Sequence, residues 1–333
     1  MRSRVDPKSL LWMTLAVTAV LLSWIGPTFA ADAAAADTAT VKLLDFEPLD
    51  AKRDRTVPVR VYLSEQDAAV PVVLFSHGLG GSRTNNAYLG KHWAAAGYVC
   101  VFMQHAGSDQ EVWQSARLRD RMSALQQAAN AKSAVDRVRD VSFVIDQLEK
   151  WNQEADHPLC GKLDLKQIGM SGHSFGAVTT LAVAGRKSLF GRSFAEERID
   201  AFFAMSPQPG EGLSAERALA HINAPMLCMT GTKDDSPIND RVTPQLRREV
   251  YKALPDGDKY ELVFDGGHHF AFGDSKGIRT HGRDPNHHPA IQKISLAFWD
   301  AYLREDPSSR QWLQSKQPTI DCRLKAADVW QWK

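Results

Sequence analysis

Residues 172–176 have the sequence Gly-His-Ser-Phe-Gly, which places Ser174 at the centre of a Gly-x-Ser-x-Gly pattern. An apolar strand-like run precedes the pattern and a helix-like run, residues 177–184, follows it, as a tight strand-to-helix turn requires. A serine hydroxyl is a weak nucleophile until it stands clear of a sheet beside a base. The two glycines let neighbouring backbone pass close to such a turn. Ser174 is therefore the candidate nucleophile if suitable partners occur elsewhere.

The candidate acids are two adjacent aspartates, Asp234 and Asp235, which follow the apolar run 226–230. A carboxylate just beyond the carboxyl end of a strand can orient a catalytic histidine, and it comes second in the chain order Ser, acid, His. We favour Asp234 because it completes a Gly-x-x-Asp spacing from Gly231, and Asp235 remains the alternative. Turns rich in Gly, Thr and Asp also carry solvated aspartates that have no catalytic role.

The candidate bases are His268 and His269, which follow the apolar run 260–264. We favour His269, three residues after Gly266, and His268 remains the alternative. A single histidine is usually a surface or core residue, but here the chain order and the strand-end positions agree with those of a nucleophile and an acid. Their agreement favours catalysis over a structural role.

A glycine-rich loop is expected to complete the site. Residues 74–81 read Leu-Phe-Ser-His-Gly-Leu-Gly-Gly, so a strand ends where several backbone N–H groups become accessible. We expect the N–H groups of Leu79 and Phe175 to bind the oxyanion of a tetrahedral intermediate, each contributing about 3 kcal/mol to lowering the barrier. His77 in this loop is expected to brace it and not to act as a base.

Strands and helices alternate along the chain, which predicts a mostly parallel sheet with helices on both faces. Pro58 cannot donate to a ladder, so its strand is expected at a sheet edge. Residues 104–132 are expected to form a helical insertion near the site, and residues 207–224 are too few for a lid domain. The expected strands are residues 41–46, 56–63, 70–75, 98–103, 165–170, 199–205, 226–230 and 260–264, and the expected helices are residues 86–96, 134–151, 213–221, 244–253 and 289–302.

The first thirty residues differ from the rest. Basic residues precede an apolar run from Leu10 to Ile25, and small residues follow it, which is typical of a secretory signal peptide. We therefore predict a signal peptide at 1–30, a disordered lead-in at 31–40 and one domain at 41–333. The expected location is secreted or periplasmic, with no stable membrane span after cleavage.

Composition and charge exclude other classes. Hydrophobic residues make up 44% of the chain and charged residues 24%, as in ordinary globular proteins. The net charge is +1 and the basic residues are scattered, so no nucleic-acid partner is expected. His281, His287, His288 and Asp284 lie in a loop rich in Gly, Asn and Pro, not on ordered elements at ligand spacing. We expect no metal and no cofactor, and we expect this loop to border the site. The oligomeric state stays open.

Export permits disulfide bonds between the cysteines. Cys100 and Cys228 lie in apolar strand-like runs and are expected to be buried free thiols. Cys160 and Cys322 lie in polar surroundings, and we expect a bridge between them that holds the C-terminal tail.

Residues 75–80 (Phe-Ser-His-Gly-Leu-Gly) together with residues 172–176 resemble the platelet-activating factor acetylhydrolase and dienelactone-hydrolase-like branch of the α/β-hydrolases. His105 and residues 108–109 (Ser-Asp) resemble exported bacterial members of that branch. The resemblance covers residues 41–305 and implies the α/β-hydrolase fold without a large lid domain.

The resemblance also implies a serine carboxylic-ester hydrolase that forms an acyl-enzyme on small-molecule or lipid esters. Ser174 stands where dienelactone hydrolases have cysteine, which argues against their substrate, and Ala177 replaces a glycine common after the turn. Short-acyl esters or short-acyl phospholipids are the favoured substrates because no lid domain fits. The alternatives are a cutinase-like polyester hydrolase, an acyltransferase and a non-catalytic binding protein on the same scaffold.

Overall fold

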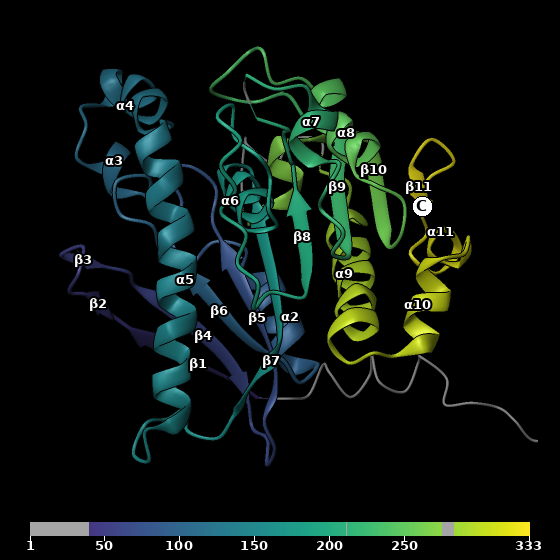
Figure 1. Cartoon of the computed structure of the whole chain (residues 1–333). Coiled ribbons are helices and arrows are strands. Elements are labelled where there is room, and N and C mark those ends of the chain that lie inside the picture. Colours follow the sequence, from purple (N-terminus) through teal and green to yellow (C-terminus); the bar gives the residue numbers. More distant parts are fainter. Residues whose placement is uncertain (1–39, 211, 275–282) are drawn as a thin grey trace, which may run out of the picture.

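A nine-stranded sheet forms the centre of the computed structural model, which describes residues 40–210, 212–274 and 283–333 (Figure 1). Its strand order is β1-β4-β6-β5-β7-β8-β9-β10-β11. The neighbours from β6 to β10 are parallel, whereas β1, β4 and β11 pair antiparallel to their neighbours. This confirms the mostly parallel sheet. The strands are β1 (Val41–Phe46), β4 (Val59–Ser64), β5 (Val70–Ser76), β6 (Val99–Met103), β7 (Leu163–His173), β8 (Ala201–Met205), β9 (Met226–Lys233), β10 (Lys259–His268) and β11 (Val329–Trp332).

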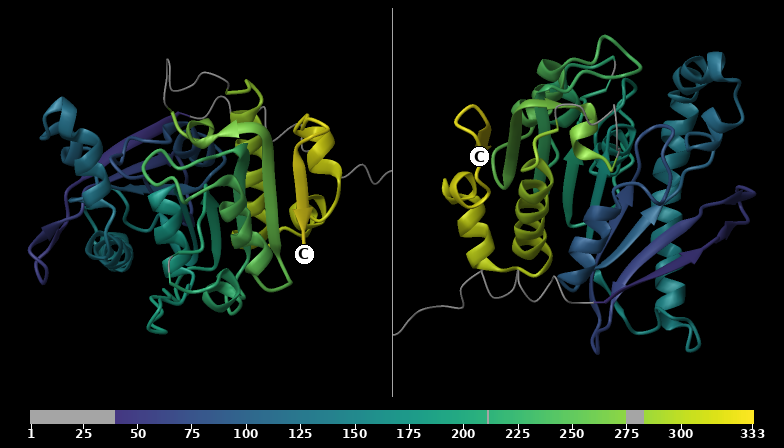
Figure 2. Two further views of the ribbon diagram at one scale, coloured as in Figure 1. Left: turned by 90° about the horizontal axis from the view of Figure 1, so that it is seen from above. Right: turned by 180° about the vertical axis from the view of Figure 1, so that it is seen from behind.

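Helices cover both faces of the sheet and bury two apolar layers (Figures 1 and 2). One layer lies under α5, α6, α7 and α8, and the other lies under α2, α9 and α10. Because parallel strands are buried on both faces, they are apolar throughout and not alternating. The helices are α2 (Ala87–Ala95), α5 (Ala131–Gln153), α6 (Phe175–Val183), α7 (Ala215–Leu219), α8 (Pro244–Ala253), α9 (His287–Leu303), α10 (Pro307–Leu313) and α11 (Gln317–Asp321).

The long helix α5 packs on one face of the sheet and carries polar side chains toward the loops at the strand ends. Its apolar stripe, with Val141, Ile145 and Leu148 fully buried, follows the spacing of a helix face packed on a core. Asn130 caps its first turn by accepting a hydrogen bond from the backbone N–H of Ser133 at 2.9 Å. The stripe fixes the rotation of α5, so its polar residues at other positions meet the loops at the strand ends.

Two short additions flank the sheet near α5. The hairpin β2 (Leu49–Asp50) and β3 (Arg55–Thr56) projects beside the helix. The insertion expected at 104–132 is helical and consists of α3 (Glu111–Gln114), the 3-10 helix η1 (Leu118–Asp120) and α4 (Arg121–Ala128).

The expectation that Pro58 marks a sheet edge is wrong. Strand β4 lies between β1 and β6, and its ladder begins at Val59, one residue after the proline. Pro58 therefore needs no ladder N–H, and its carbonyl accepts a hydrogen bond from the backbone N–H of Gln104 at 2.8 Å. A proline just outside a strand sets no limit on where the strand lies in the sheet.

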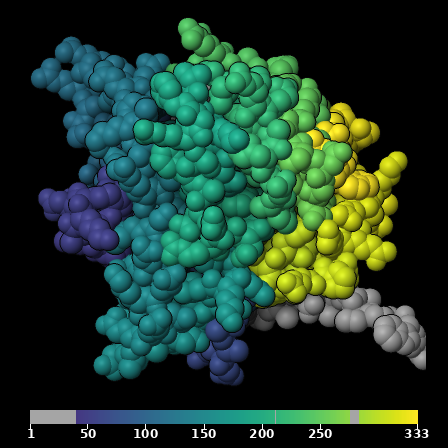
Figure 3. All heavy atoms as spheres, viewed as in Figure 1, coloured from purple at the N-terminus to yellow at the C-terminus, as the bar shows by residue number. Residues whose placement is uncertain are grey.

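The C-terminal segment adds elements that the sequence did not predict. Helices α10 and α11 follow α9, and β11 then pairs antiparallel with the outer strand β10. The rings of Tyr260 and Trp330 stack at 5.9 Å across this pair. In the space-filling view the segment, coloured yellow, lies against the green part of the molecule that contains β10 (Figure 3).

The expected Cys160–Cys322 bridge is also wrong, since all four cysteines are free. Cys160 lies just before β7, whereas Cys322 is buried in the C-terminal segment, beyond β8, β9 and β10 in the strand order. The polar sequence around Cys322 conceals its burial, because the apolar contacts come from distant residues. Cys100 and Cys228 are buried thiols, as expected.

The predicted signal peptide at 1–30 and most of the lead-in at 31–40 lie outside the described residues. Across residues 40–210, 212–274 and 283–333, no helix has the length and apolar character needed to cross a membrane.

Candidate active site

Ser174 lies in a strained turn between β7 and α6. Its backbone has φ 57° and ψ −115°, a conformation that serine rarely adopts, and its N–H donates to the carbonyl of Met205 at 2.9 Å. A Cβ on Gly176 would lie 1.8 Å from the carbonyl oxygen of Ser76, and one on Gly172 would lie 2.4 Å from Gly176. Only glycine fits at either position. The side chain of Ser174 remains partly exposed.

His269 lies against Ser174. It begins the 3-10 helix η2 (His269–Phe272) directly after β10, and the Ser174 hydroxyl donates to its Nε2 at 2.9 Å. The alternative, His268, is the last residue of β10, and its ring lies 6.5 Å from that of Phe270. The structure therefore brings His269 and Ser174 together, as favoured from the sequence.

Asp234 completes a hydrogen-bonded series of three side chains. His269 Nδ1–H donates to Asp234 Oδ1 at 2.8 Å, and Asp234 is fully buried just beyond the end of β9. Asp235, the alternative, has an exposed side chain. The order Ser174, His269, Asp234 has the geometry in which an imidazole can take a proton from a serine while a carboxylate orients it.

Two further side chains hold the Asp234 carboxylate. Thr230 donates its hydroxyl to Oδ2 at 2.8 Å, and Arg247 of α8 lies with Nε 3.1 Å from Oδ1. Arg247 also donates to the carbonyl oxygens of Ser206 at 2.5 Å and of Asp234 at 2.7 Å. Burial alone would raise the pKa of Asp234, but the hydrogen bond from His269 and the charge of Arg247 outweigh it and keep the pKa below its usual value. The carboxylate is ionised and held at both oxygens.

His173 supports the base from the other side. Its Nε2–H donates to the backbone carbonyl of His269 at 3.1 Å, and the two rings lie 4.8 Å apart. Burial, with a smaller contribution from the neighbouring His269, lowers the pKa of His173 to about 3, so it remains neutral. Sequence patterns gave no role to His173, Arg247 or Thr230. The one local signal was a threonine on β9, four residues before the acid.

The glycine-rich loop lies beside the serine. A Cβ on Gly78 would lie 3.4 Å from the Cβ of Ser174, which places the Gly78–Leu79 peptide at the site. The backbone N–H of Phe175 is in the first turn of α6, where helical N–H groups have no partner within the helix. His77 is fully buried, and its Nδ1–H donates to the Gly78 carbonyl at 2.6 Å, in keeping with its expected bracing role.

Helices α3 and α4 form a wall against this loop. Trp113 donates its indole N–H to the carbonyl of Gly80 at 2.8 Å, and a Cβ on Gly80 would meet the side chain of Leu125 at 2.7 Å. Gln126 donates to the carbonyl of Ile238 at 3.2 Å, so α4 reaches the loop that follows Asp234. The helical insertion therefore lies near the site, as predicted from the sequence.

A separate polar groove of about 730 Å³ lies beyond this wall, between the β2–β3 hairpin and α5. Its lining includes Arg55, Asp109 and Arg139 but none of the three hydrogen-bonded side chains at the site. An ester bound in this groove would therefore not be in contact with Ser174.

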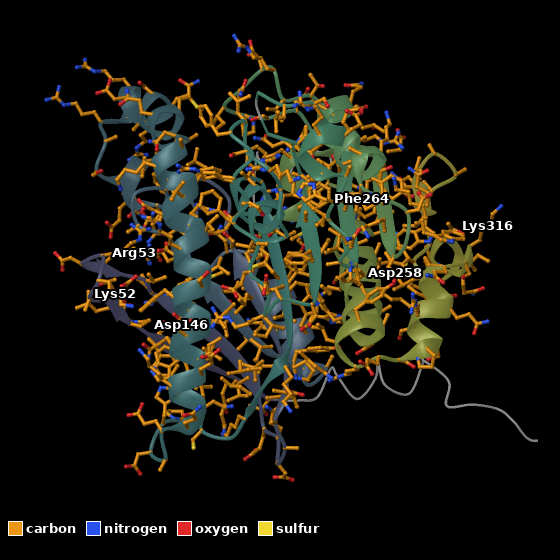
Figure 4. The ribbon with its side chains drawn as sticks, in the orientation of Figure 1. Lys52, Arg53, Asp146, Asp258, Phe264 and Lys316 are labelled. Atoms are coloured by element: carbon orange, nitrogen blue, oxygen red, sulfur yellow. The ribbon has the colours of Figure 1, made fainter. Side chains whose placement is uncertain are left out.

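His287 and His288, which were expected to lie in a loop, are the first two residues of helix α9, and both make packing contacts. His287 lies 4.3 Å from the ring of Phe264 on β10, and His288 stacks on Tyr88 at 3.8 Å. Figure 4 labels Phe264. Asp284 pairs with Lys325 at 2.7 Å, and His281 lies outside the described residues. Within the described ranges, no group of three or more His, Cys, Asp or Glu side chains is arranged to hold a metal ion.

Comparison with known families gives a match over residues 55–124 to the family described as platelet-activating factor acetylhydrolase, isoform II. The match covers the glycine-rich loop, the segment with His105, and most of the helical wall, and it ends before Ser174. The chain resembles the platelet-activating factor acetylhydrolase branch of the α/β-hydrolases. A search of curated proteins found no match.

The platelet-activating factor acetylhydrolase resemblance agrees with the architecture. A mostly parallel sheet with helices on both faces is the α/β-hydrolase fold, and the described residues of this chain form no large lid. The family whose model matches residues 55–124 consists of carboxylic-ester hydrolases.

Proposed function

We propose that the chain is an exported serine esterase that cleaves short-acyl esters or short-acyl phospholipids through an acyl-enzyme. The observation that carries the proposal is the series of hydrogen bonds from Ser174 through His269 to Asp234, at 2.9 and 2.8 Å. The match to the platelet-activating factor acetylhydrolase family supports the substrate class, since its members cleave esters.

In this mechanism Ser174 Oγ attacks the ester carbonyl while His269 Nε2 takes the hydroxyl proton. Asp234 orients the imidazole and stabilises the imidazolium. The backbone N–H groups of Leu79 and Phe175 bind the oxyanion that forms on the carbonyl oxygen. His269 then gives its proton to the departing alcohol, which leaves an acyl group on Ser174. A water molecule, deprotonated by His269, releases the acid and restores the serine.

The direct test replaces the nucleophile. Ser174→Ala should lower hydrolysis of p-nitrophenyl acetate by at least about 10³-fold, since loss of a triad member leaves only binding and oxyanion stabilisation. A fluorophosphonate should label wild-type protein once, and mass spectrometry should place the label on Ser174. The matched control is Ser123→Ala, an exposed serine of α4. Undiminished turnover by pure, folded Ser174→Ala protein would rule out this mechanism.

Export is tested separately from chemistry. The full chain, expressed in a Gram-negative host, should release a mature form into the periplasm or medium with a new N-terminus near residue 31, which N-terminal sequencing identifies. An unprocessed chain held in the membrane fraction would contradict the predicted signal peptide without affecting the triad assignment.

A further inference from the structure

A buried polar cluster lies behind the glycine-rich loop, and the proposed reaction does not use any of its side chains. It joins the end of β5, the loop after β6 and the first half of α5. Its members are at most 1% exposed, and they are Ser76, His77, His105, Ser108, Arg137 and Asp140. Buried polar groups lower the stability of the folded chain unless they are hydrogen-bonded to one another. A cluster of six such side chains beside the candidate site therefore indicates a specific role.

Asp140 anchors the cluster. Arg53 and Arg55, from the hairpin beside α5 (Figure 4 labels Arg53), both donate to its Oδ1 at 2.8 Å, and Arg55 also donates to Oδ2. His105 Nδ1–H donates to Oδ2 at 2.9 Å. Burial would raise the pKa of Asp140, but the hydrogen bonds from His105 and Arg55 outweigh it and hold the pKa at about 2. The carboxylate is a fixed negative charge.

His105 connects Asp140 to β5. Its Nε2 accepts a hydrogen bond from the Ser76 hydroxyl at 2.9 Å. Ser76, His105 and Asp140 therefore repeat the order of groups found at Ser174, but Ser76 is fully buried and no ester can reach it. Burial, with a smaller effect from Arg137, lowers the pKa of His105 to about 4, so the ring stays neutral with its proton on Nδ1. The arrangement is rigid support and not a second nucleophile.

Arg137 links this support to both halves of the oxyanion site. Its Nη1 donates to the carbonyl of His77 at 2.8 Å, and its Nε donates to the Ser108 hydroxyl at 2.9 Å. Its guanidinium also lies 4.5 Å from the ring centre of Phe175, whose N–H is one proposed oxyanion donor. One side chain thus contacts the glycine-rich loop and the residue that follows the nucleophile.

The second oxyanion donor is oriented through a peptide plane. His77 Nε2 accepts from the N–H of His105 at 3.1 Å, which leaves Nδ1–H to donate to the carbonyl of Gly78. Gly81 N–H donates to the same carbonyl at 3.0 Å. The Gly78–Leu79 peptide is trans, so its N–H points opposite to its C=O. Fixing the Gly78 oxygen therefore fixes the direction of the Leu79 N–H.

We propose that Arg137 is a positioning residue that sets the oxyanion site by holding the His77 carbonyl and the Phe175 ring in one geometry. The inference rests on the proposed function, because it assumes that Leu79 and Phe175 stabilise an oxyanion. Arg137 acts through the loop and does not touch the ester. Its effect should appear in the transition state and not in substrate binding.

The test compares Arg137→Met and Arg137→Lys with Arg139→Met, an exposed arginine on the same helix. Both Arg137 variants should lower kcat about ten- to a hundredfold, less than the roughly 10²–10³ for a lost donor, with KM changed less than about threefold. Lysine should not restore kcat, since it lacks the planar fork that reaches both acceptors. A trifluoromethyl ketone reacts with Ser174 Oγ to give a hemiketal whose former carbonyl oxygen is an oxyanion. The affinity for this inhibitor should fall in parallel with kcat. Arg139→Met should match wild type in all three measurements.

Unchanged kcat in Arg137→Met, full rescue by lysine, or a loss confined to KM would each overturn the inference. If Arg137→Met does not fold, Ser108→Ala removes the Nε partner of Arg137, together with the hydrogen bond from the Ser108 hydroxyl to the His105 carbonyl. It should lower kcat a few-fold, again with KM changed less than about threefold, and wild-type kcat in that variant would overturn the inference. The two proposals fail differently. Hydrolysis that survives Ser174→Ala removes the proposed function, whereas an inactive Ser174→Ala beside a fully active Arg137→Met removes only the positioning role.

Discussion

Arg247 and Asp234 form a buried ion pair in which the guanidinium Nε lies 3.1 Å from the same carboxylate oxygen that accepts the hydrogen bond of His269. Both side chains are at most 2% exposed. The arginine comes from a helix and the aspartate from a strand end, so the pair ties α8 to the candidate site. It also places a fixed positive charge next to the imidazole, which Asp234 has to balance when the imidazolium forms.

Replacing Arg247 by Met should lower kcat by about tenfold or more, because Asp234 Oδ1 keeps the hydrogen bond of His269 but loses the guanidinium, so the carboxylate remains buried without its charge partner. The control is Arg248→Met, since Arg248 pairs with Glu261 and is about one-third exposed. Steady-state kinetics on p-nitrophenyl acetate measure the effect, with thermal unfolding recorded for both proteins. Equal kcat in the two variants would show that Asp234 holds its orientation without Arg247.

Asp234→Asn should lower kcat about 10⁴-fold, as expected when the amide stabilises the wrong histidine tautomer. Asp235→Asn changes an exposed side chain and should stay within about twofold of wild type. For the base, His269→Ala should likewise lower kcat more than His268→Ala. If either ranking is reversed, the other member of that pair is the catalytic one.

Gly176→Ala should prevent folding or lower the free energy of unfolding by at least about 3 kcal/mol, because the new methyl group would lie 1.8 Å from the backbone oxygen of Ser76. Gly273→Ala is the matched control, since a Cβ there meets nothing within 4 Å and its φ is −103°. Urea denaturation compares the two. A stable, active Gly176→Ala protein would mean that the elbow and β5 can separate.

Stability should fall as the pH drops below about 6.5. Burial depresses the pKa of His105 to about 4 and that of His173 to about 3, so between these values and 6.5 the unfolded chain binds protons that the folded chain does not. Each histidine then removes up to about 1.4 kcal/mol per pH unit from the free energy of unfolding. Above 6.5 the contribution of both is constant.

Urea denaturation at pH 7, 6 and 5 measures this slope. His173→Gln keeps a donor near the His269 carbonyl but does not titrate, so it should flatten the slope by the share of one histidine. An unchanged slope in that variant would mean that His173 takes up a proton without unfolding the chain.

The ratio kcat/KM should peak at acyl chains of roughly two to six carbons, because the described residues form no large lid that could bury a longer chain at about 0.8 kcal/mol per CH₂. A series of p-nitrophenyl esters from acetate to palmitate, with a short-acyl phospholipid, gives the profile. Trp113→Ala should move the optimum toward longer acyl groups, since Trp113 lies against Gly80 at the wall. Activity that rises steadily with chain length and jumps at a lipid interface would favour a true lipase.

The residues of the site that follow strand ends could be predicted from the sequence. Ser174, Asp234 and His269 each stand one short turn beyond an apolar run, and a parallel sheet brings such positions to one edge. Arg247 and Arg137 were not accessible in this way. They lie on helices, where a charged residue ordinarily faces solvent, and only packing between distant segments shows that they point inward.

The same distinction between local sequence and distant packing explains which predictions about the fold were wrong. Strand β11 has only four residues, lies at the C-terminal end of the described chain and pairs with β10. Such a short segment shows no alternating pattern by which a strand can be predicted from the sequence. Cys322 is buried by residues that its own sequence neighbourhood does not include. Pro58 was assigned to a strand that begins at the next residue, an error at an element boundary, where sequence patterns are least reliable.

The contact between Gly176 and the Ser76 carbonyl has a consequence for how new specificities can arise on this scaffold. The nucleophile turn and the central strand are so close that neither can accept a larger residue. Random mutagenesis should therefore yield almost no active variants with substitutions in the turn or at the end of β5. Helices α3 and α4 meet the loop through the side chains of Trp113 and Leu125, which smaller or larger residues can replace. Variants selected for bulkier esters should therefore accumulate substitutions between residues 111 and 128, while the chemistry beneath them stays constant.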